Sequence, residues 1–196
     1  MKIILLIGAL WLPCSTHAAQ NVLVFGDSLS AGYGIQTEES WPVLLQHELN
    51  ESDYRVVNAS ISGETTQGGR QRIAQTLLRH RPAVVILELG ANDGLRGYAT
   101  TDIEANLNKL IVDIKRSGAS VLLVGMRLPP NYGKTYVSQF EELYPRLAKA
   151  RSVRLLPFLL EGVPPEQFQP DNLHPTAAAQ PLIMRKVLKE LRPLLD

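Results

Sequence analysis

Cysteine is nearly absent from this sequence. Cys14 is the one cysteine among 196 residues, and it lies inside an N-terminal segment that we expect to be removed. A mature chain without cysteine can form no disulfide and carries no thiol nucleophile. The composition therefore excludes a cysteine hydrolase.

An apolar run long enough to span a bilayer is also missing from the N-terminus. The run at residues 3–12 falls short of the roughly 20 residues that a membrane anchor needs. Lys2 precedes this run, and Thr16 and Ala18 place small residues three positions and one position before a cut. This pattern predicts a secretory signal peptide over residues 1–18, cleaved after Ala18 give or take one residue. We therefore expect a periplasmic or secreted protein with no stable membrane insertion after cleavage.

Lipidation of Cys14 is the other processing event to weigh. Leu12 stands two positions before Cys14, which makes Cys14 a candidate, but Pro13 occupies the position where a small residue is wanted. We therefore do not expect lipidation at Cys14.

An excess of charge of one sign is lacking as well. The formal net charge is +1, with 20% charged and 45% hydrophobic residues. This balance is typical of a soluble globular protein and gives no reason to expect nucleic acid as a partner. With no internal repeat or linker, residues 19–196 are expected to form one domain with a full core, which we expect to be a monomer.

Short apolar runs alternate with segments of helical periodicity along the chain. Strands without polar alternation, separated by helices, predict a parallel sheet covered on both faces, which is a three-layer α/β/α sandwich. In such a sheet the ligand site lies at the carboxyl ends of the strands. The expected strands cover residues 22–25, 54–59, 83–89, 120–125 and 153–156, and the last two expected helices cover residues 137–150, kinked or interrupted at Pro145, and 177–191.

The loop after the first expected strand carries a candidate nucleophile. Ser28 lies in Gly-Asp-Ser-Leu-Ser, residues 26–30, directly after the apolar run. A serine hydroxyl is a weak nucleophile and needs a neighbouring base. A phosphate-binding loop or a helix cap is the alternative, but the lysine and the spacing of a nucleotide loop are absent, so no cofactor is expected.

A candidate base and acid occur together late in the chain. Asp171 and His174 are three residues apart in Asp-Asn-Leu-His, so one short loop can aim both side chains at Ser28. His174 would accept the serine proton, and Asp171 would hold the imidazole in the correct tautomer. The alternative is an ordinary loop histidine before the last helix.

Two further loops offer hydrogen-bond donors for a developing oxyanion. Gly63 follows the second strand and allows its backbone N–H to approach a substrate closely. Asn92 follows the third strand and has a side-chain amide. Together with the Ser28 N–H they would supply three donors for a tetrahedral intermediate. Taken alone, Gly63 could be a turn glycine, and residues 92–94, Asn-Asp-Gly, are equally a turn signal.

A metal site is the competing chemistry. Asp27, Asp93, Asp171 and His174 could form an oxygen-rich site for a divalent cation. A hydrolytic metal site normally has more histidine or carboxylate ligands with their own spacing. We therefore expect no metal.

The four loops together resemble a known family. Residues 26–29, Gly63, residues 90–93 and residues 171–174 are similar to the four sequence blocks of the GDSL, or SGNH, hydrolases, and within them to a bacterial periplasmic group of thioesterase I/protease I/lysophospholipase enzymes. This resemblance implies a flavodoxin-like sheet with strand order 2-1-3-4-5. It also implies a Ser28, Gly63 and Asn92 oxyanion hole and activity on acyl-CoA thioesters, lysophospholipids and aryl or short-chain alkyl esters. Ala91 stands where a second glycine is common, which is tolerable unless that position needs a positive φ.

A set of mostly apolar residues near the same sheet edge is a candidate acyl groove. Packing of the loops against the fold is the alternative explanation for them. The set comprises Leu95, Tyr98, Met126, Leu128, Pro129 and Tyr132.

The resulting prediction is an exported serine esterase of broad specificity, which cleaves small acyl esters and thioesters through Ser28, His174 and Asp171. A carbohydrate acetylesterase on the same fold is one alternative and would have polar rather than apolar loops. A non-enzymatic periplasmic lipid-binding module is the other, although it would have no use for a base beside a nucleophile.

Overall fold

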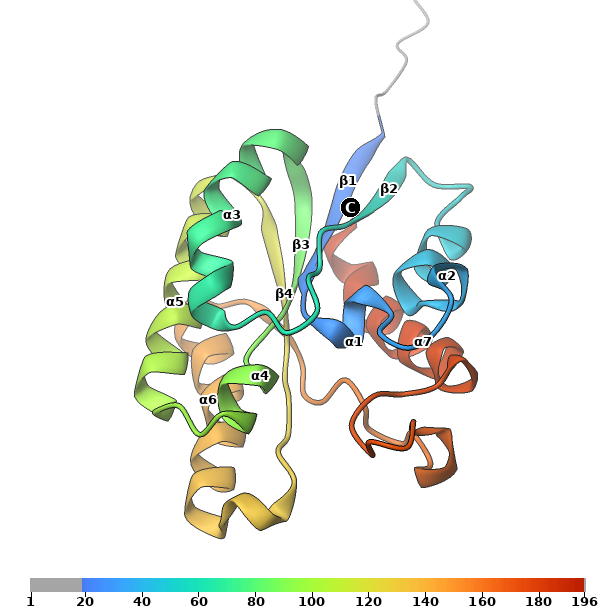
Figure 1. The fold of residues 1–196 in the computed structure, drawn as a ribbon. Helices are drawn as coiled ribbons and strands as arrows, with labels where there is room; N and C mark the ends of the chain where they lie inside the picture. Colours follow the sequence, from blue (N-terminus) through green and yellow to red (C-terminus); the bar gives the residue numbers. More distant parts are fainter. Residues whose placement is uncertain (1–18, 196) are drawn as a thin grey trace, which may run out of the picture.

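A five-stranded parallel sheet forms the centre of the protein, in the computed structural model that describes residues 19–195 (Figure 1). Its strand order is β2-β1-β3-β4-β5, which confirms the predicted order. The strands are β1 (Gln20–Gly26), β2 (Tyr54–Asn58), β3 (Pro82–Glu88), β4 (Ser120–Val124) and β5 (Arg154–Leu156). The predicted signal peptide, Cys14 included, lies outside the described residues.

Helices cover both faces of the sheet and complete the predicted three-layer sandwich. On one face α3 (Thr66–His80) packs against α5 (Thr100–Arg116), which packs against α6 (Lys134–Arg151). On the other face α2 (Trp41–Glu48) packs against α7 (Gln180–Leu191) (Figure 1). The remaining helical segments are the short helices α1 (Ser28–Ala31) and α4 (Ala91–Leu95) and the 3-10 turns Thr37–Glu39, Pro130–Tyr132, Pro165–Gln167, Ala177–Ala179 and Arg192–Leu194.

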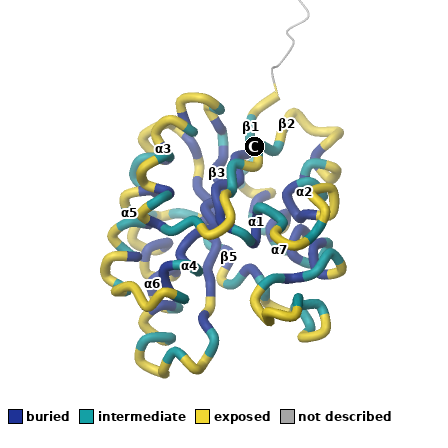
Figure 2. Tube along the Cα trace, viewed as in Figure 1, coloured by how far each residue is buried: buried dark blue, intermediate teal, exposed yellow. Residues whose placement is uncertain are grey.

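The core lies between the sheet and these two helical layers. The central strands are buried on both faces, as their uninterrupted apolar runs require, while the outer sides of the helices are exposed (Figure 2). Helix α5 contributes a stripe of apolar side chains at helical spacing, all fully buried: Ile103, Leu107, Leu110, Ile111 and Ile114. The strands therefore form a rigid base from which loops project at the carboxyl edge.

Pro145 does not interrupt α6, which corrects part of the prediction for that segment. The helix is a single element over Lys134–Arg151 with Pro145 inside it. Pro145 is on the exposed face of the helix, where water can bond the backbone carbonyl that the missing N–H leaves free. The last helix also differs, because a 3-10 turn over Ala177–Ala179 precedes α7.

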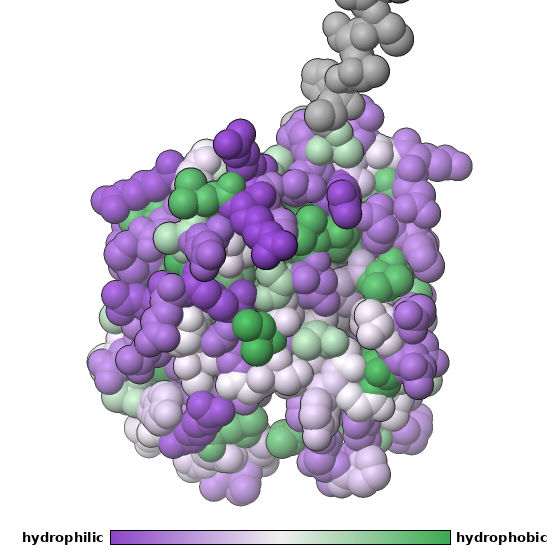
Figure 3. Space-filling view, turned by 45° about the horizontal axis from the view of Figure 1, so that its top comes forward, coloured by the Kyte–Doolittle hydropathy of each residue, from purple (hydrophilic) through white to green (hydrophobic). Residues whose placement is uncertain are grey.

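One face of the molecule is shown by hydropathy in Figure 3. The face seen in Figure 3 carries scattered apolar side chains among polar and charged ones. Within residues 19–195 no helix combines the length and the apolar character needed to cross a bilayer.

Candidate active site

The end of β1 holds the candidate nucleophile in a tight turn. Gly26 lies directly against Glu88 of β3, and a Cβ at Gly26 would come within 2.5 Å of a Glu88 carboxylate oxygen. Only glycine fits there, a constraint that the sequence did not reveal. Asp27 then caps α1 by accepting a 3.1 Å hydrogen bond from the Leu29 N–H, which leaves Ser28 half-buried at the start of the helix.

The loop over residues 171–174 folds around its own aspartate. One oxygen of Asp171 accepts hydrogen bonds from the backbone N–H groups of Leu173 (2.9 Å) and His174 (3.0 Å). Its other oxygen lies 2.7 Å from Nδ1 of His174. This arrangement requires Asn172 to adopt a left-handed backbone conformation, φ 56°, which asparagine tolerates better than most residues.

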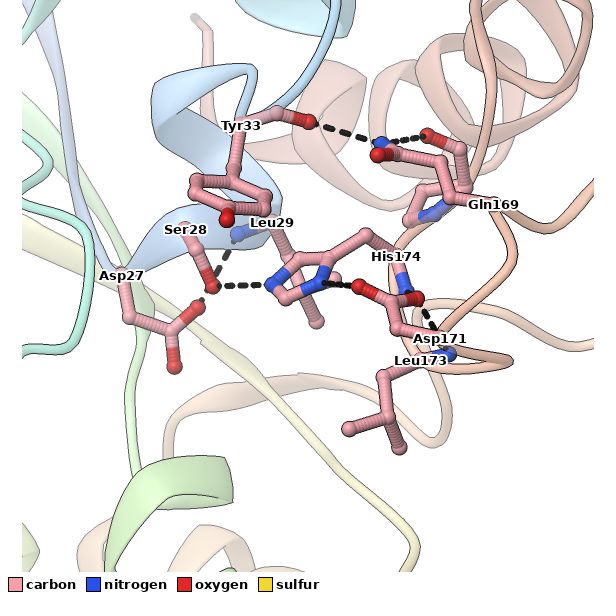
Figure 4. Close-up of polar contacts among 9 residues, drawn as sticks. Asp27, Ser28, Leu29, Tyr33, Gln169, Asp171, Leu173 and His174 are labelled. Carbon is pink, nitrogen blue, oxygen red and sulfur yellow. Dashed lines mark hydrogen bonds and ion pairs between the residues drawn. The ribbon is translucent and has the colours of Figure 1, made fainter.

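The structure brings Ser28, His174 and Asp171 together. Nε2 of His174 lies 2.8 Å from the Ser28 Oγ, across 146 residues of sequence (Figure 4). With Nδ1 protonated and bonded to Asp171, Nε2 is the free acceptor and faces the serine hydroxyl. The three side chains therefore form an unbroken hydrogen-bonded chain, in the geometry that lets an imidazole accept a serine proton.

Asp171 remains charged in this arrangement. Partial burial opposes its ionisation, but the hydrogen bonds from the His174 backbone and ring and from the Leu173 N–H outweigh burial and lower the pKa of Asp171 to about 2. A carboxylate that is ionised at any working pH can stabilise an imidazolium beside it.

Further contacts join the His174 loop to the Ser28 loop. The Gln169 Nε2 donates to the Tyr33 carbonyl at 2.8 Å and to the Pro175 carbonyl at 3.2 Å (Figure 4). The Tyr33 ring lies over the His174 ring, with centroids 4.6 Å apart. Sequence reasoning missed Gln169 and Tyr33, since only the fold brings them beside residues with recognisable chemistry.

The three candidate oxyanion donors follow three adjacent strands, as expected. Ser28 follows β1, Gly63 follows β2, and Asn92 is part of α4 after β3. Gly63 has a φ of +79° and open space where a Cβ would stand, so its backbone is unobstructed. Asn92 is in a short helix rather than the turn that residues 92–94 suggested, and its Nδ2 donates to Asp27 at 3.0 Å.

Ala91 fits its position without strain. Among the described residues other than glycine, positive φ angles occur at Arg81, Ser152 and Asn172. Ala91 begins α4, and it is the preceding residue, Gly90, that takes the positive φ of +116°. The second glycine of the family pattern is therefore not needed here.

An apolar cavity of about 370 Å³ opens beside the serine and the histidine. Of the six predicted groove residues, four line it, whereas Tyr98 and Tyr132 do not. The Tyr132 hydroxyl instead donates to the Leu95 carbonyl at 3.0 Å and supports the wall from behind. The apolar lining comprises Leu29, Ala91, Leu95, Met126, Leu128, Pro129, Phe158, Leu160, Phe168 and Leu173.

Six of these ten lining residues were not predicted to line the groove. Two of them, Leu29 and Ala91, belong to the motifs around Ser28 and Asn92, and the other four come from the chain after β5. Phe158 and Leu160 follow β5, Phe168 lies further along the same connection, and Leu173 stands between Asp171 and His174. Ligand sites lie at the carboxyl ends of parallel strands, and this holds for β5 as for the other strands. The position of Phe158 and Leu160 directly after β5 could therefore have identified them as lining residues.

The four residues weighed as a metal site do not form one cluster. Asp93 bonds the Thr66 backbone N–H and hydroxyl at 2.9 and 2.6 Å, and Asp27 bonds Asn92. Within residues 19–195 no group of three or more histidine, cysteine, aspartate or glutamate side chains is placed to hold a metal ion.

Comparison with known proteins decides the family. A model of the GDSL-like lipase/acylhydrolase family matches residues 24–181. The chain belongs to this family. It is 49% identical to an arylesterase of Vibrio mimicus over 92% of both chains. It is 45% identical to thioesterase 1/protease 1/lysophospholipase L1 of Escherichia coli K12, over 91% of this chain and 86% of that protein.

The fold agrees with that assignment. The crystal structure of TesA superposes with a TM-score of 0.87 at 46% identity, covering 90% of this chain and 100% of that one. The predicted GDSL family membership and its flavodoxin-like sheet are both confirmed.

Proposed function

We propose that this GDSL-family hydrolase is a broad-specificity esterase and thioesterase for substrates with an apolar acyl chain. The observation that carries the proposal is the unbroken chain from Ser28 Oγ through His174 to Asp171 at the mouth of an apolar cavity. The named activities of the relatives, arylesterase and thioesterase/lysophospholipase, support the same class of substrate.

In the first half-reaction Ser28 Oγ attacks the acyl carbonyl carbon while His174 Nε2 takes the hydroxyl proton. The carbonyl oxygen becomes an oxyanion, which accepts hydrogen bonds from the Ser28 N–H, the Gly63 N–H and the Asn92 amide. The carbon–oxygen or carbon–sulfur bond then breaks, and His174 gives its proton to the departing alcohol or thiol. The acyl group is left on Ser28.

In the second half-reaction water replaces the leaving group. His174 takes a proton from the water, whose oxygen attacks the acyl carbon through a second oxyanion. Collapse returns the proton to Ser28 Oγ and releases a carboxylic acid. Asp171 holds the imidazole tautomer through both halves and balances the charge of the imidazolium.

The cavity lining distinguishes the substrate classes. Leu95, Met126 and Phe158 are among its walls, and an apolar wall gains free energy from each methylene that it removes from water, about 0.8 kcal/mol per buried CH₂. A carbohydrate acetylesterase would need polar groups for the sugar hydroxyls, and a lipid carrier would need no base beside a serine. Both alternatives therefore fit less well.

Export completes the proposal. Residues 1–18 carry the pattern of a cleaved secretory signal, so the mature enzyme would begin at Ala19 and act in the periplasm or outside the cell. N-terminal sequencing of the protein recovered from a periplasmic fraction tests this; a mature chain that still begins at Met1, recovered with the cytosol, would contradict it.

Hydrolysis of p-nitrophenyl esters and acyl-CoA thioesters, from acetyl to dodecanoyl, tests the chemistry. We expect the parent to cleave both series and Ser28→Ala to lose about 10⁴–10⁶-fold in kcat. Ser138→Ala, which alters an exposed serine on α6, serves as the matched control and should keep parental rates. Near-parental turnover by Ser28→Ala would overturn the proposed nucleophile.

A further inference from the structure

Asp27 is adjacent to the nucleophile, fully buried, and has no proton-transfer role in the reaction above. Both of its carboxylate oxygens are engaged. One accepts the Leu29 N–H at 3.1 Å, and the other accepts Asn92 Nδ2 at 3.0 Å. A buried carboxylate with one local and one distant partner does more than cap a helix, because a cap needs only the first of these contacts.

The contact with Asn92 determines which end of that amide faces the serine loop. A side-chain amide has a donating nitrogen and an accepting oxygen of nearly the same shape. A carboxylate accepts hydrogen bonds and cannot donate them, so it selects the nitrogen. Of the two Nδ2 hydrogens one is used by Asp27, and the second remains available to an oxyanion. Were the amide reversed, its oxygen would repel the oxyanion.

Asp27 is itself held from the adjacent strand. Its backbone N–H donates to Glu88 at 3.1 Å, and Ser30 Oγ donates to the same carboxylate oxygen at 2.6 Å. Glu88 and Ser30 are fully buried, so this support is shielded from water. These contacts therefore hold the carboxylate of Asp27 in one position between the ends of β1 and β3.

The C-terminal end of α4 is hydrogen-bonded to the loop that carries Gly63, another of the three oxyanion donors. Arg96, one turn after Asn92, donates to the Gly63 carbonyl at 3.2 Å. The Ile61 N–H donates to the Gly26 carbonyl at 3.0 Å and joins the loop after β2 to the end of β1. Hydrogen bonds thus connect each of the loops that carry Ser28, Gly63 and Asn92 to the other two. The bond from Asn92 to Asp27 is the one that holds an oxyanion-donating side chain in place.

We propose that Asp27 is a positioning residue that orients the Asn92 amide so that its free N–H points at the oxyanion. This inference rests on the proposed function, since it assigns Asn92 to that oxyanion. Asp27 touches no reacting atom and acts through Asn92, so its loss should reduce turnover while leaving substrate affinity nearly unchanged.

Two substitutions separate this role from helix capping. Asp27→Asn keeps the size of the side chain and one acceptor, but it cannot serve both N–H groups. Asp27→Ser retains a good cap and is too short to reach Asn92. We expect both to lower kcat about 10- to 100-fold, which stays below the roughly 10²–10³-fold loss expected for removing one oxyanion donor through Asn92→Ala. KM should change by less than about threefold, since uniform binding is not lost.

A double-mutant cycle makes the inference falsifiable. When Asn92 is already alanine, Asp27→Ser should cost less than about threefold more in kcat, because the residue it orients is gone. If Asp27→Ser instead costs the same factor with and without Asn92, Asp27 acts through Ser28 or the fold, and the inference fails. An inactive parent enzyme would instead count against the proposed function.

Two measurements do not depend on turnover. Affinity for a dodecyl trifluoromethyl ketone, whose adduct with a serine carries an oxyanion, should fall in Asp27→Ser by the same factor as kcat/KM. In ¹⁵N-edited NMR of the parent, the Asn92 side-chain amide, assigned by its loss in Asn92→Ala, should show one strongly downfield proton that Asp27→Asn removes. Unchanged ketone affinity or an unchanged amide spectrum would overturn the inference even if one of the variants folds poorly.

Discussion

Two aspartates lie near Ser28, Asp27 directly before it in sequence and Asp171 beyond the His174 ring (Figure 4), and their surroundings are opposite. Asp27 is fully buried, whereas the side chain of Asp171 is 38% exposed. Burial raises the pKa of Asp27 to about 6, although hydrogen bonds from the Leu29 N–H and from Asn92 favour its charged form. The pKa of Asp171 is lowered to about 2. The more exposed aspartate is thus the one whose charge is secure.

The two aspartates also differ in where their hydrogen-bond partners lie in the sequence. Asp171 receives its hydrogen bonds from residues two and three positions along the chain, so its site is built by one short loop. The side-chain and backbone partners of Asp27 include Asn92 of α4 and Glu88 of β3, more than 60 residues away. Asp171, which stays charged, suits a reaction in which the neighbouring His174 becomes an imidazolium. Asp27, which is buried and held by distant partners, suits the orientation of another side chain.

Of the changes that test this comparison, substitution of the exposed aspartate, Asp171, is expected to have the largest effect on kcat. Asp171→Asn keeps the shape of the loop but removes the charge and favours the wrong imidazole tautomer, so kcat should fall by about 10⁴-fold. Pre-steady-state cleavage of p-nitrophenyl octanoate measures the acylation rate directly. Glu166→Gln, an exposed carboxylate earlier in the same connection, should leave that rate unchanged. A loss below about tenfold in Asp171→Asn would show that its charge is dispensable.

The local half of this comparison is also the half that is easiest to recognise in the sequence. Asp171 and His174 stand three residues apart, and the apolar runs that form the strands are continuous in sequence. The strands could therefore be predicted from these runs, whereas the order of the sheet was predicted from the resemblance to the GDSL hydrolases.

What escaped prediction depends on contacts between distant segments. Gly26 must be glycine because Glu88 lies against it, and Gln169 bridges Tyr33 and Pro175. Tyr98 and Tyr132 carry the right side chains for an acyl groove, yet neither lines the cavity, because the direction of a side chain in a loop has no sequence period. The short helices α1 and α4 were missed because four or five residues are too few to show helical periodicity.

A smaller effect is expected from the wall of the cavity, on the same exposed loop. Leu173 lines the cavity, and Leu173→Ser removes apolar contact while keeping the N–H that bonds Asp171. The ratio of kcat/KM for dodecanoyl to acetyl esters should fall about 5- to 30-fold, since about 1–2 kcal/mol of burial is lost from long chains only. Leu78→Ser, at the exposed leucine of α3, is the matched control. Equal losses on acetyl and dodecanoyl esters would argue against an acyl groove.

A smaller effect still is expected from loosening the contact between the two loops. Gln169→Ala removes two hydrogen bonds, to Tyr33 and to Pro175, each worth about 1 kcal/mol. Because the Ser28 to His174 alignment relies on these loops staying in register, kcat should fall about 3- to 10-fold. Gln139→Ala on the exposed face of α6 controls for the loss of a glutamine. Turnover unchanged by Gln169→Ala would mean that the loop holds His174 without help from Gln169.

The last prediction tests the buried side of the comparison at Glu88 and concerns stability rather than turnover. Burial and the neighbouring Asp27 charge raise the pKa of Glu88 well above its usual 4.5. Between pH 4.5 and the raised pKa, Glu88 is ionised in the unfolded chain but keeps its proton in the folded protein. The parent therefore loses stability as the pH rises through this range, by up to about 1.4 kcal/mol per pH unit. Glu88→Gln cannot ionise and lacks this contribution. Urea unfolding from pH 5 to pH 8 should therefore give a shallower decline for Glu88→Gln than for the parent or for the exposed variant Glu38→Gln. Parallel slopes for all three proteins would mean that Glu88 is ionised in the folded state, and the buried support beneath Asp27 would then carry a charge rather than a proton.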